Sequence, residues 1–189
     1  MNVLNFVGLL LGSSWGSGIN LYLTVAGLGI AHRIGWITLP GQLEGISSLP
    51  VIIIAVVLFV IEFFADKIPY VDSAWDSFHT FIRPAGGAIM GYLATSEIGP
   101  AVQIPVGLFT GAVSLDSHLT KASSRVAINS SPEPISNSVA SVTEDSFVIG
   151  VLWLIINHPI LAGIFVVLFI LFSIWFLKVM FKFVKKIFK

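Results

Sequence analysis

Long uninterrupted apolar runs, rather than alternating apolar and polar positions, dominate this sequence. The clearest run is 159–177, which contains no charged residue. As a helix it would span about 28 Å, close to the thickness of the hydrocarbon core of a bilayer. A second run covers 49–65 and is interrupted only by Glu62, and a shorter run covers 142–157. These runs predict helices that cross a membrane.

The N-terminal apolar segment, 3–31, is interrupted by a cluster of small and polar residues between Ser13 and Asn20. A continuous helix of this length would be about 43 Å long, which exceeds the hydrocarbon core. We therefore expect a break, either as one helix broken at mid-depth or as two half-helices forming a hairpin. An interfacial helix followed by a loop and a first crossing is a third interpretation.

Two further segments, 84–96 and 100–120, each begin with a proline, and the apolar part of the second ends at 113. Proline is favoured at the first position of a helix. The segments are predicted either to cross as a short pair or to enter the membrane and return. Glycines four residues apart in both segments indicate close helix packing.

The predicted fold is an all-α polytopic membrane protein with one domain, 1–189, and interfacial amphipathic helices beside its crossings. About six helical segments are expected, some of them short, broken or re-entrant. They lie near 3–31, 49–66, 84–96, 100–120, 142–157 and 159–177, followed by a basic interfacial tail at 178–189.

Composition supports this class of protein. The chain is 56% hydrophobic and 11% charged, which is too little charge for a soluble domain of ordinary composition. The sequence contains no cysteine, so disulfides, thiolate metal sites and cysteine nucleophiles are excluded.

The distribution of basic residues predicts the orientation. Five of the ten Lys and Arg residues lie in the tail, 178–189. With the tail in the cytoplasm, every basic residue except Arg33 falls on the cytoplasmic side, as the positive-inside rule requires. We expect a multi-pass protein of a bacterial inner membrane with both termini cytoplasmic, and a tail that binds anionic lipid.

Two polar stripes follow helical spacing and form the main candidate site. One face of the segment 67–83 carries Asp72, Asp76, His79 and Arg83. This face is either the solvated side of an interfacial helix or the wall of a polar cavity. The second stripe, with the same spacing, consists of Ser114, His118, Lys121 and Arg125, with Asn129 one turn further.

The opposite charges of the two stripes predict that they face each other, for example through a pair of Asp76 with Lys121 or Arg125. Glu62 lies inside a predicted crossing, with Asp66 one turn further on the same face. A charge at this depth either faces a partner or cavity, or extends toward the interface. The expected break at Ser13–Asn20 would present Trp15 and Asn20 to the same cavity.

Two blocks of residues resemble one bacterial membrane protein family over nearly the whole chain. The first block reads Glu62-Phe-Phe-Ala-Asp66-Lys67-Ile-Pro69 and continues through Asp72, Trp75-Asp76 and His79-Thr80 to Ile82-Arg83-Pro84-Ala85-Gly86. The second contains His118-x-x-Lys121-Ala122-x-x-Arg125, Asn129-x-Ser131-Pro132-Glu133-Pro134 and Ser136-Asn137. This family is known as domain of unknown function 4126. The resemblance implies the class of protein and that both stripes belong to the family pattern, and it implies no activity.

The favoured function is a transporter, or a protein that translocates a lipid or small anion through a polar cavity. The anion-binding candidates are Arg83, His118, Lys121, Arg125 and Asn129. The cavity and charge-network candidates are Glu62, Asp66, Asp72, Asp76, His79, Trp15 and Asn20.

A structural or assembly protein is the alternative function, and an intramembrane enzyme is less favoured. No Gly-x-Ser-x-Gly or His-Glu-x-x-His motif occurs, so no catalytic residue is predicted. Arg83 on the same face as the acids argues against a metal site. We expect no cofactor and no nucleic-acid partner. The expected partners are membrane lipids and a possible second copy of the chain.

Overall fold

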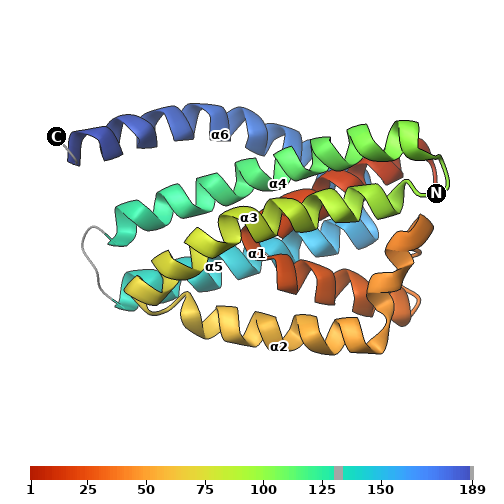
Figure 1. The fold of residues 1–189 in the computed structure, drawn as a ribbon, viewed down its shortest axis with the longest axis horizontal. Helices are drawn as coiled ribbons and strands as arrows, with labels where there is room; N and C mark the ends of the chain where they lie inside the picture. The colour runs from red at the N-terminus through yellow and green to blue at the C-terminus, as the bar shows by residue number, and fades with distance from the viewer. Residues whose placement is uncertain (130–133, 188–189) are drawn as a thin grey trace.

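The computed structural model describes residues 1–129 and 134–187, and every regular element in them is a helix. The long helices run back and forth along one axis (Figure 1). This arrangement confirms the predicted all-α fold. The elements are α1 (Val3–Arg33), the 3-10 helix η1 (Gly41–Ser47), α2 (Leu49–Ala65), α3 (Pro69–Ala94), α4 (Pro100–Asn129), α5 (Pro134–Asn157) and α6 (Pro159–Ile187).

Helix α1 is broken at a single residue, Asn20, whose φ of −148° and ψ of 98° are not helical. Gly16 lies against the side chain of Thr24. In a straight helix these residues would be about 12 Å apart along the axis. The chain therefore reverses at Asn20, and the two halves of α1 form a hairpin.

The first half of the hairpin begins, and the second half finishes, at the same end of the bundle. Gly8 lies against the backbone of Pro159, at the junction of α5 and α6, and Gly29 lies against the backbone of Ile46 in η1. These contacts lie at the end where α1 begins (Figure 1). Asn20 is thus the tip of a hairpin that reaches only part of the way along the bundle. Of the interpretations left open by the sequence, the hairpin is the one observed.

The side chain of Asn20 explains why the helix breaks there. Its Oδ1 accepts a hydrogen bond of 2.9 Å from the amide of Leu23, which caps the second half-helix. Its Nδ2 donates to Asp145 on α5. The preceding residues Ser13–Ile19 are helical, so the expected broad interruption is confined to one position. The glycines there permit close packing instead, because Gly18 lies directly against the α4 backbone.

Helix α4 begins at Pro100, as the sequence predicted, and continues beyond 120 to Asn129, with Pro105 inside it. Helix α3 differs from the prediction, because it begins at Pro69 and runs through Pro84 instead of starting there. The two helices pack closely where Gly87 and Gly91 of α3 meet Ser114 and Thr110 of α4. This contact holds both helices together across the positions where the prolines remove a hydrogen bond. The stripes are therefore parts of long helices, and their side chains are buried inside the bundle.

Other boundaries also differ from those predicted. Helix α5 begins at Pro134, so the crossing predicted at 142–157 is extended by its N-terminal part. Helix α6 continues to Ile187 and contains most of the basic tail. Residues 130–133, which belong to the second block of the family resemblance, lie outside the described residues.

The apolar core follows both halves of α1 and includes side chains of η1, α3, α4, α5 and α6. Trp15 packs edge-on against Phe165, with 5.0 Å between ring centroids, and against Phe169. Val148, Val151 and other aliphatic side chains are buried beside them. Beyond the tip of the hairpin, the interior of the bundle is filled by charged side chains instead.

The outside of the bundle is apolar where its inside is charged. On α3, Phe78 and Phe81 are 72% and 80% exposed, whereas Asp72 and Arg83 are fully buried. Within the described residues, two helices are long and apolar enough to cross a membrane, Ile135–Asn157 and Pro159–Phe183. The pair formed by η1 and α2, bent by 66°, would be a third span.

The ends of the chain lie at opposite ends of the bundle. Helix α1 begins at one end and α6 finishes at the other (Figure 1). The reversal at Asn20 places both ends of α1 at the same end of the bundle, and helices α2 to α6 then run alternately until α6 finishes at the other end.

Candidate functional site

A network of charged side chains fills the interior between the tip of the α1 hairpin and the end of the bundle where α2 meets α3. It brings together helices α2, α3, α4 and α5. Five acids and three bases in this region are buried, counted over the described residues. They are Glu62, Asp66, Asp72, Asp76, Asp145, Arg83, Lys121 and Arg125.

Arg83 lies at the end of this network that is next to the tip of the α1 hairpin. Its Nη2 donates to Glu62 Oε1 at 2.6 Å, and its Nη1 donates to Asp76 Oδ1 at 3.1 Å. The same Nη1 is 2.9 Å from His118 Nδ1 and 3.4 Å from the carbonyl oxygen of Gly18 at the α1 break. One guanidinium therefore joins α2, α3, α4 and α1.

Lys121 lies at the centre of the network. Its Nζ is 2.8 Å from Asp66 Oδ2, 3.5 Å from Glu144 Oε2 and 3.8 Å from Glu62 Oε1. It also donates to the carbonyl oxygen of Ile19, the residue just before the break. Freed carbonyls at a helix break need donors, and Arg83 and Lys121 supply them.

Arg125 lies at the opposite end of the network, away from the hairpin tip. It makes a two-pronged pair with Glu144, at 3.1 Å from Nε and 2.6 Å from Nη2. Its Nη1 donates to the backbone carbonyl and the side-chain oxygen of Asn137, and lies 3.7 Å from Asp72 Oδ1. Asp72 also accepts from Asn129 at 2.9 Å.

The hydrogen bonds of the two buried histidines define their neutral tautomers. His118 Nδ1 receives a hydrogen from Arg83, so its proton is on Nε2, which is 3.0 Å from the Thr80 hydroxyl. His79 Nδ1 is 2.8 Å from the Trp75 carbonyl and must donate to it. His79 Nε2 then accepts from the Tyr22 hydroxyl at 3.0 Å.

Asp145 differs from the other buried acids. Its Oδ1 accepts from Asn20 at the hairpin tip, at 2.9 Å, and it belongs to none of the ion pairs of the described residues. The neutral form of such a carboxyl costs less to bury than the ionised form. Within the described part of the chain, five carboxyl oxygens in the network lack a hydrogen-bond partner. They are Glu62 Oε2, Asp66 Oδ1, Asp72 Oδ1, Asp76 Oδ2 and Asp145 Oδ2.

The structure brings together nearly all of the residues predicted from the sequence. The two stripes face each other, as expected, through Arg83 with His118 and Asp72 with Arg125. The partner of Lys121 is Asp66 rather than Asp76, which pairs with Arg83 instead. Trp15 lies outside the network, in the aromatic core.

Several members of the network were not predicted from the sequence. Glu144 and Asp145 of α5 are the most important, and Asn137 and Tyr22 are the others. Adjacent acids in an otherwise apolar run were the available signal. They lie near the start of the run predicted at 142–157, and acids are common and usually exposed at the start of a helix.

The network does not have the form of a metal site. No group of three or more His, Asp or Glu side chains in the described residues is arranged to hold a metal ion. Each of the three bases lies among the carboxylates, at the distances given above, and this arrangement matches ion pairing.

An apolar exterior around a buried charged interior, together with helices long and apolar enough to cross a membrane, is typical of helical membrane proteins. The chain belongs to the family described as Domain of unknown function (DUF4126), whose profile matches residues 7–179. The match includes the α1 hairpin and both stripes, and it confirms the resemblance noted in the sequence. No curated protein and no solved structure matches the chain.

Proposed function

We propose that this chain is a membrane transport protein that conducts protons through the buried charged network. The observation that carries the proposal is the excess of buried acids, five against three bases in the described residues, with five carboxyl oxygens lacking a hydrogen-bond partner. Such oxygens can hold a proton or accept a hydrogen bond from water. Ionisable groups buried at membrane depth typically form ion pathways and proton relays.

The proposed membrane arrangement has five crossings, α2 to α6, with α1 entering and leaving from one side. The end with Lys67, Lys178 and Lys182 faces the cytoplasm of a bacterial cell, and the end with Arg33 faces outward. In this arrangement the N-terminus is outside and the C-terminus inside. The exposed Lys178 and Lys182 extend α6 toward anionic lipid.

Single-cysteine labelling tests this arrangement, because the chain contains no cysteine of its own. Asn2→Cys and Trp36→Cys should react with an impermeant maleimide added to intact cells, since both residues are exposed at the outer end. Lys182→Cys should react only after the membrane is opened. Labelling of Asn2→Cys and Lys182→Cys from the same side would contradict the hairpin topology.

The hairpin and the network together supply the two parts of a pathway. The network extends from Asn129 and Asp72 at the inner end of the bundle to Arg83 and Asp145 beside the hairpin tip. Beyond it, the two halves of α1 fill the bundle with largely apolar side chains. Broken helices at membrane depth are typical of transporters, where their unwound backbone meets the transported ion. Asp145 at the tip is the carboxyl that we assign to proton exchange.

Proton flux into liposomes tests the assignment of Asp145. The purified protein should acidify the interior when a potassium–valinomycin potential is applied, read with a trapped pH dye. Asp145→Asn should lower the flux by roughly a hundredfold, the lower end of what one positioned proton-transfer group contributes. The amide keeps an oxygen to accept from Asn20, and no ion pair is lost, so folding should be retained.

The matched control is Glu44→Gln, the same loss of charge at an exposed position on η1. It should leave the flux unchanged. Wild-type flux equal to that of protein-free liposomes, or full flux in Asp145→Asn, would overturn proton conduction. The first of these results would favour the structural or assembly role.

Translocation of a small anion is the weaker proposal, although the sequence favoured it. Arg83, Lys121 and Arg125 each contact two or more carboxylates. An anion could bind them only by displacing a carboxylate, which would leave that acid buried without a partner.

A further inference from the structure

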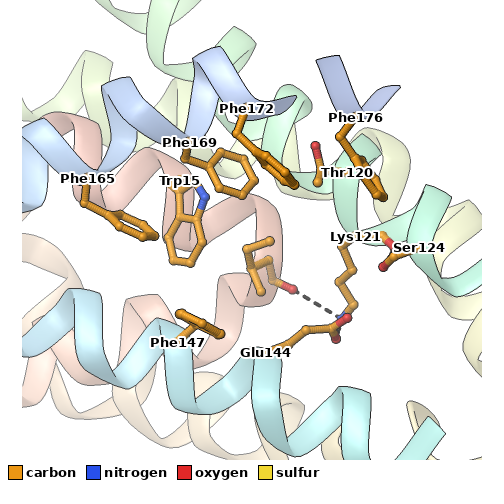
Figure 2. Close-up of a pocket in the computed structure, with 11 residues that line it drawn as sticks. Trp15, Thr120, Lys121, Ser124, Glu144, Phe147, Phe165, Phe169, Phe172 and Phe176 are labelled. Atoms are coloured by element: carbon orange, nitrogen blue, oxygen red, sulfur yellow. Dashed lines mark hydrogen bonds and ion pairs between the residues drawn. The ribbon is translucent and has the colours of Figure 1, made fainter. Parts of the chain in front are cut away.

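A cavity of about 370 Å³ lies beside the charged network, between α1, α4, α5 and α6. Figure 2 shows that aromatic side chains surround it on the α6 and α5 sides and that charged side chains lie at its other end. Its volume and mainly apolar walls are those of sites for small molecules. The aromatic residues are Trp15, Phe147, Phe165, Phe169, Phe172 and Phe176.

The polar end of the cavity is formed by Lys121, Glu144, Thr120 and Ser124. Lys121 and Glu144 compensate each other at 3.5 Å, so this wall carries no net charge. The hydroxyls of Thr120 and Ser124 already donate to carbonyls of their own helix and retain the capacity to accept. A polar group without net charge therefore fits this end better than an anion or a cation.

The cavity borders the surface that faces lipid in the proposed arrangement. Phe147 of α5 and Phe172 of α6 line it and are 56% and 48% exposed. A molecule that enters the cavity between these rings would enter laterally from the lipid bilayer. The buried Trp15, whose indole N–H has no hydrogen-bond partner in the described residues, forms part of the wall.

We propose that this cavity binds a single-chain amphiphile with an uncharged, hydrogen-bonding polar group, such as a monoacylglycerol. Its chain lies among the aromatic rings, and its polar group meets Lys121 and Glu144. This inference rests on the proposed transport function for its membrane setting. Lys121 and Glu144 also belong to the charged network, so the cavity and the network share one wall.

Quenching of Trp15 emission tests binding without measuring proton movement. A variant with only Trp15 is made by Trp36→Phe, Trp75→Phe, Trp153→Phe and Trp175→Phe. The probe is a monoacylglycerol with bromine on its chain, since bromine quenches indole emission only at short range. Trp15 is 3% exposed, so probe in the surrounding micelle should not reach it. We expect saturable quenching of Trp15 at low probe concentration.

Four controls define the site. A variant that keeps only the exposed Trp175 should be quenched in simple proportion to the probe. Ser124→Phe, which fills the polar end, should abolish saturable quenching of Trp15. Ser77→Phe, at an exposed serine outside the cavity with the same kind of hydroxyl bond to its own helix, should not. A brominated fatty acid should quench Trp15 only at much higher concentration.

Absence of saturable quenching in the variant that keeps Trp15 would overturn the proposal, provided that the Trp175 variant is quenched. Equal quenching in Ser124→Phe would place the probe elsewhere and would also overturn it. Stronger quenching by the fatty acid would contradict the uncharged polar group. None of these results depends on flux, so a protein that conducts protons without binding the amphiphile, or the reverse, would be recognised.

Discussion

Replacing Arg83 by methionine should destabilise the protein more than any other single substitution in the network. The side chain is fully buried and is the direct hydrogen-bond donor to both Glu62 and Asp76. Removal of one partner from a buried ion pair typically costs about 3–5 kcal/mol, because the remaining charge stays buried without compensation. Here two carboxylates lose their guanidinium at once, and Gly18 at the α1 break loses a donor.

The measurement is the thermal unfolding midpoint in detergent, with Arg33→Met as control. Arg33 is exposed and makes a single long hydrogen bond, so its loss should change little. The double variant Arg83→Met, Glu62→Gln should be more stable than Arg83→Met alone, because it removes one uncompensated charge. Equal stability of Arg83→Met and the wild type would mean that the network does not hold the bundle together.

Gly18→Ala should also be strongly destabilising, although it adds only a methyl group. A Cβ at this position would overlap the Ser117 hydroxyl and the Ser114 carbonyl of α4. The carbonyl belongs to the backbone, so α1 and α4 must move apart. Overpacking of this kind typically costs about 1–3 kcal/mol. The shift would also disturb the nearby hydrogen bond from Lys121 to Ile19.

The matched control is Gly150→Ala in α5, where an added Cβ would meet no atom. Alanine is the better helix former by about 1 kcal/mol, so this variant should be neutral or slightly more stable. Unfolding midpoints of the two variants in the same detergent provide the comparison. If Gly18→Ala were as stable as Gly150→Ala, the close approach of the hairpin to α4 would be wrong.

Most helix positions could be predicted from the sequence because apolar runs of bilayer length are helical under almost any packing. The predicted segments 49–66 and 159–177 correspond closely to α2 and to the apolar part of α6. Proline was less informative. At Pro84 it resembles a helix start, but packing of α3 on α4 carries the helix through it.

The direction of the chain after Asn20 could not be predicted. An asparagine that caps a new helix is compatible with a modest kink and with a full reversal. The outcome depends on contacts of Gly16 with Thr24 and of Gly18 with α4, which are set by tertiary packing. The side predicted for the N-terminus depends on the same contacts, because a reversal at Asn20 changes the side of every residue before it.

The facing of the two stripes was predictable from charge, but the individual pairs were not. Spacing along α3 and α4 places acids opposite bases. This spacing does not predict the partners that come from other elements. Asp66, at the junction of α2 and α3, pairs with Lys121, and Glu144 of α5 pairs with Arg125. Each of these pairs depends on how a third helix packs.

The hairpin also gives the interior a built-in electric polarity. A continuous spanning helix keeps its two dipole ends at the membrane surfaces, whereas the break in α1 brings both kinds of end to the middle of the bundle. The carbonyl end of the first half points to Arg83 and Lys121, and the amide end of the second half begins at Asn20, which binds Asp145. The two cations therefore lie at the carbonyl end of the first half-helix, and the acid lies at the amide end of the second. The partial charges of peptide groups, which cannot be titrated away, hold this separation whatever the protonation of the side chains.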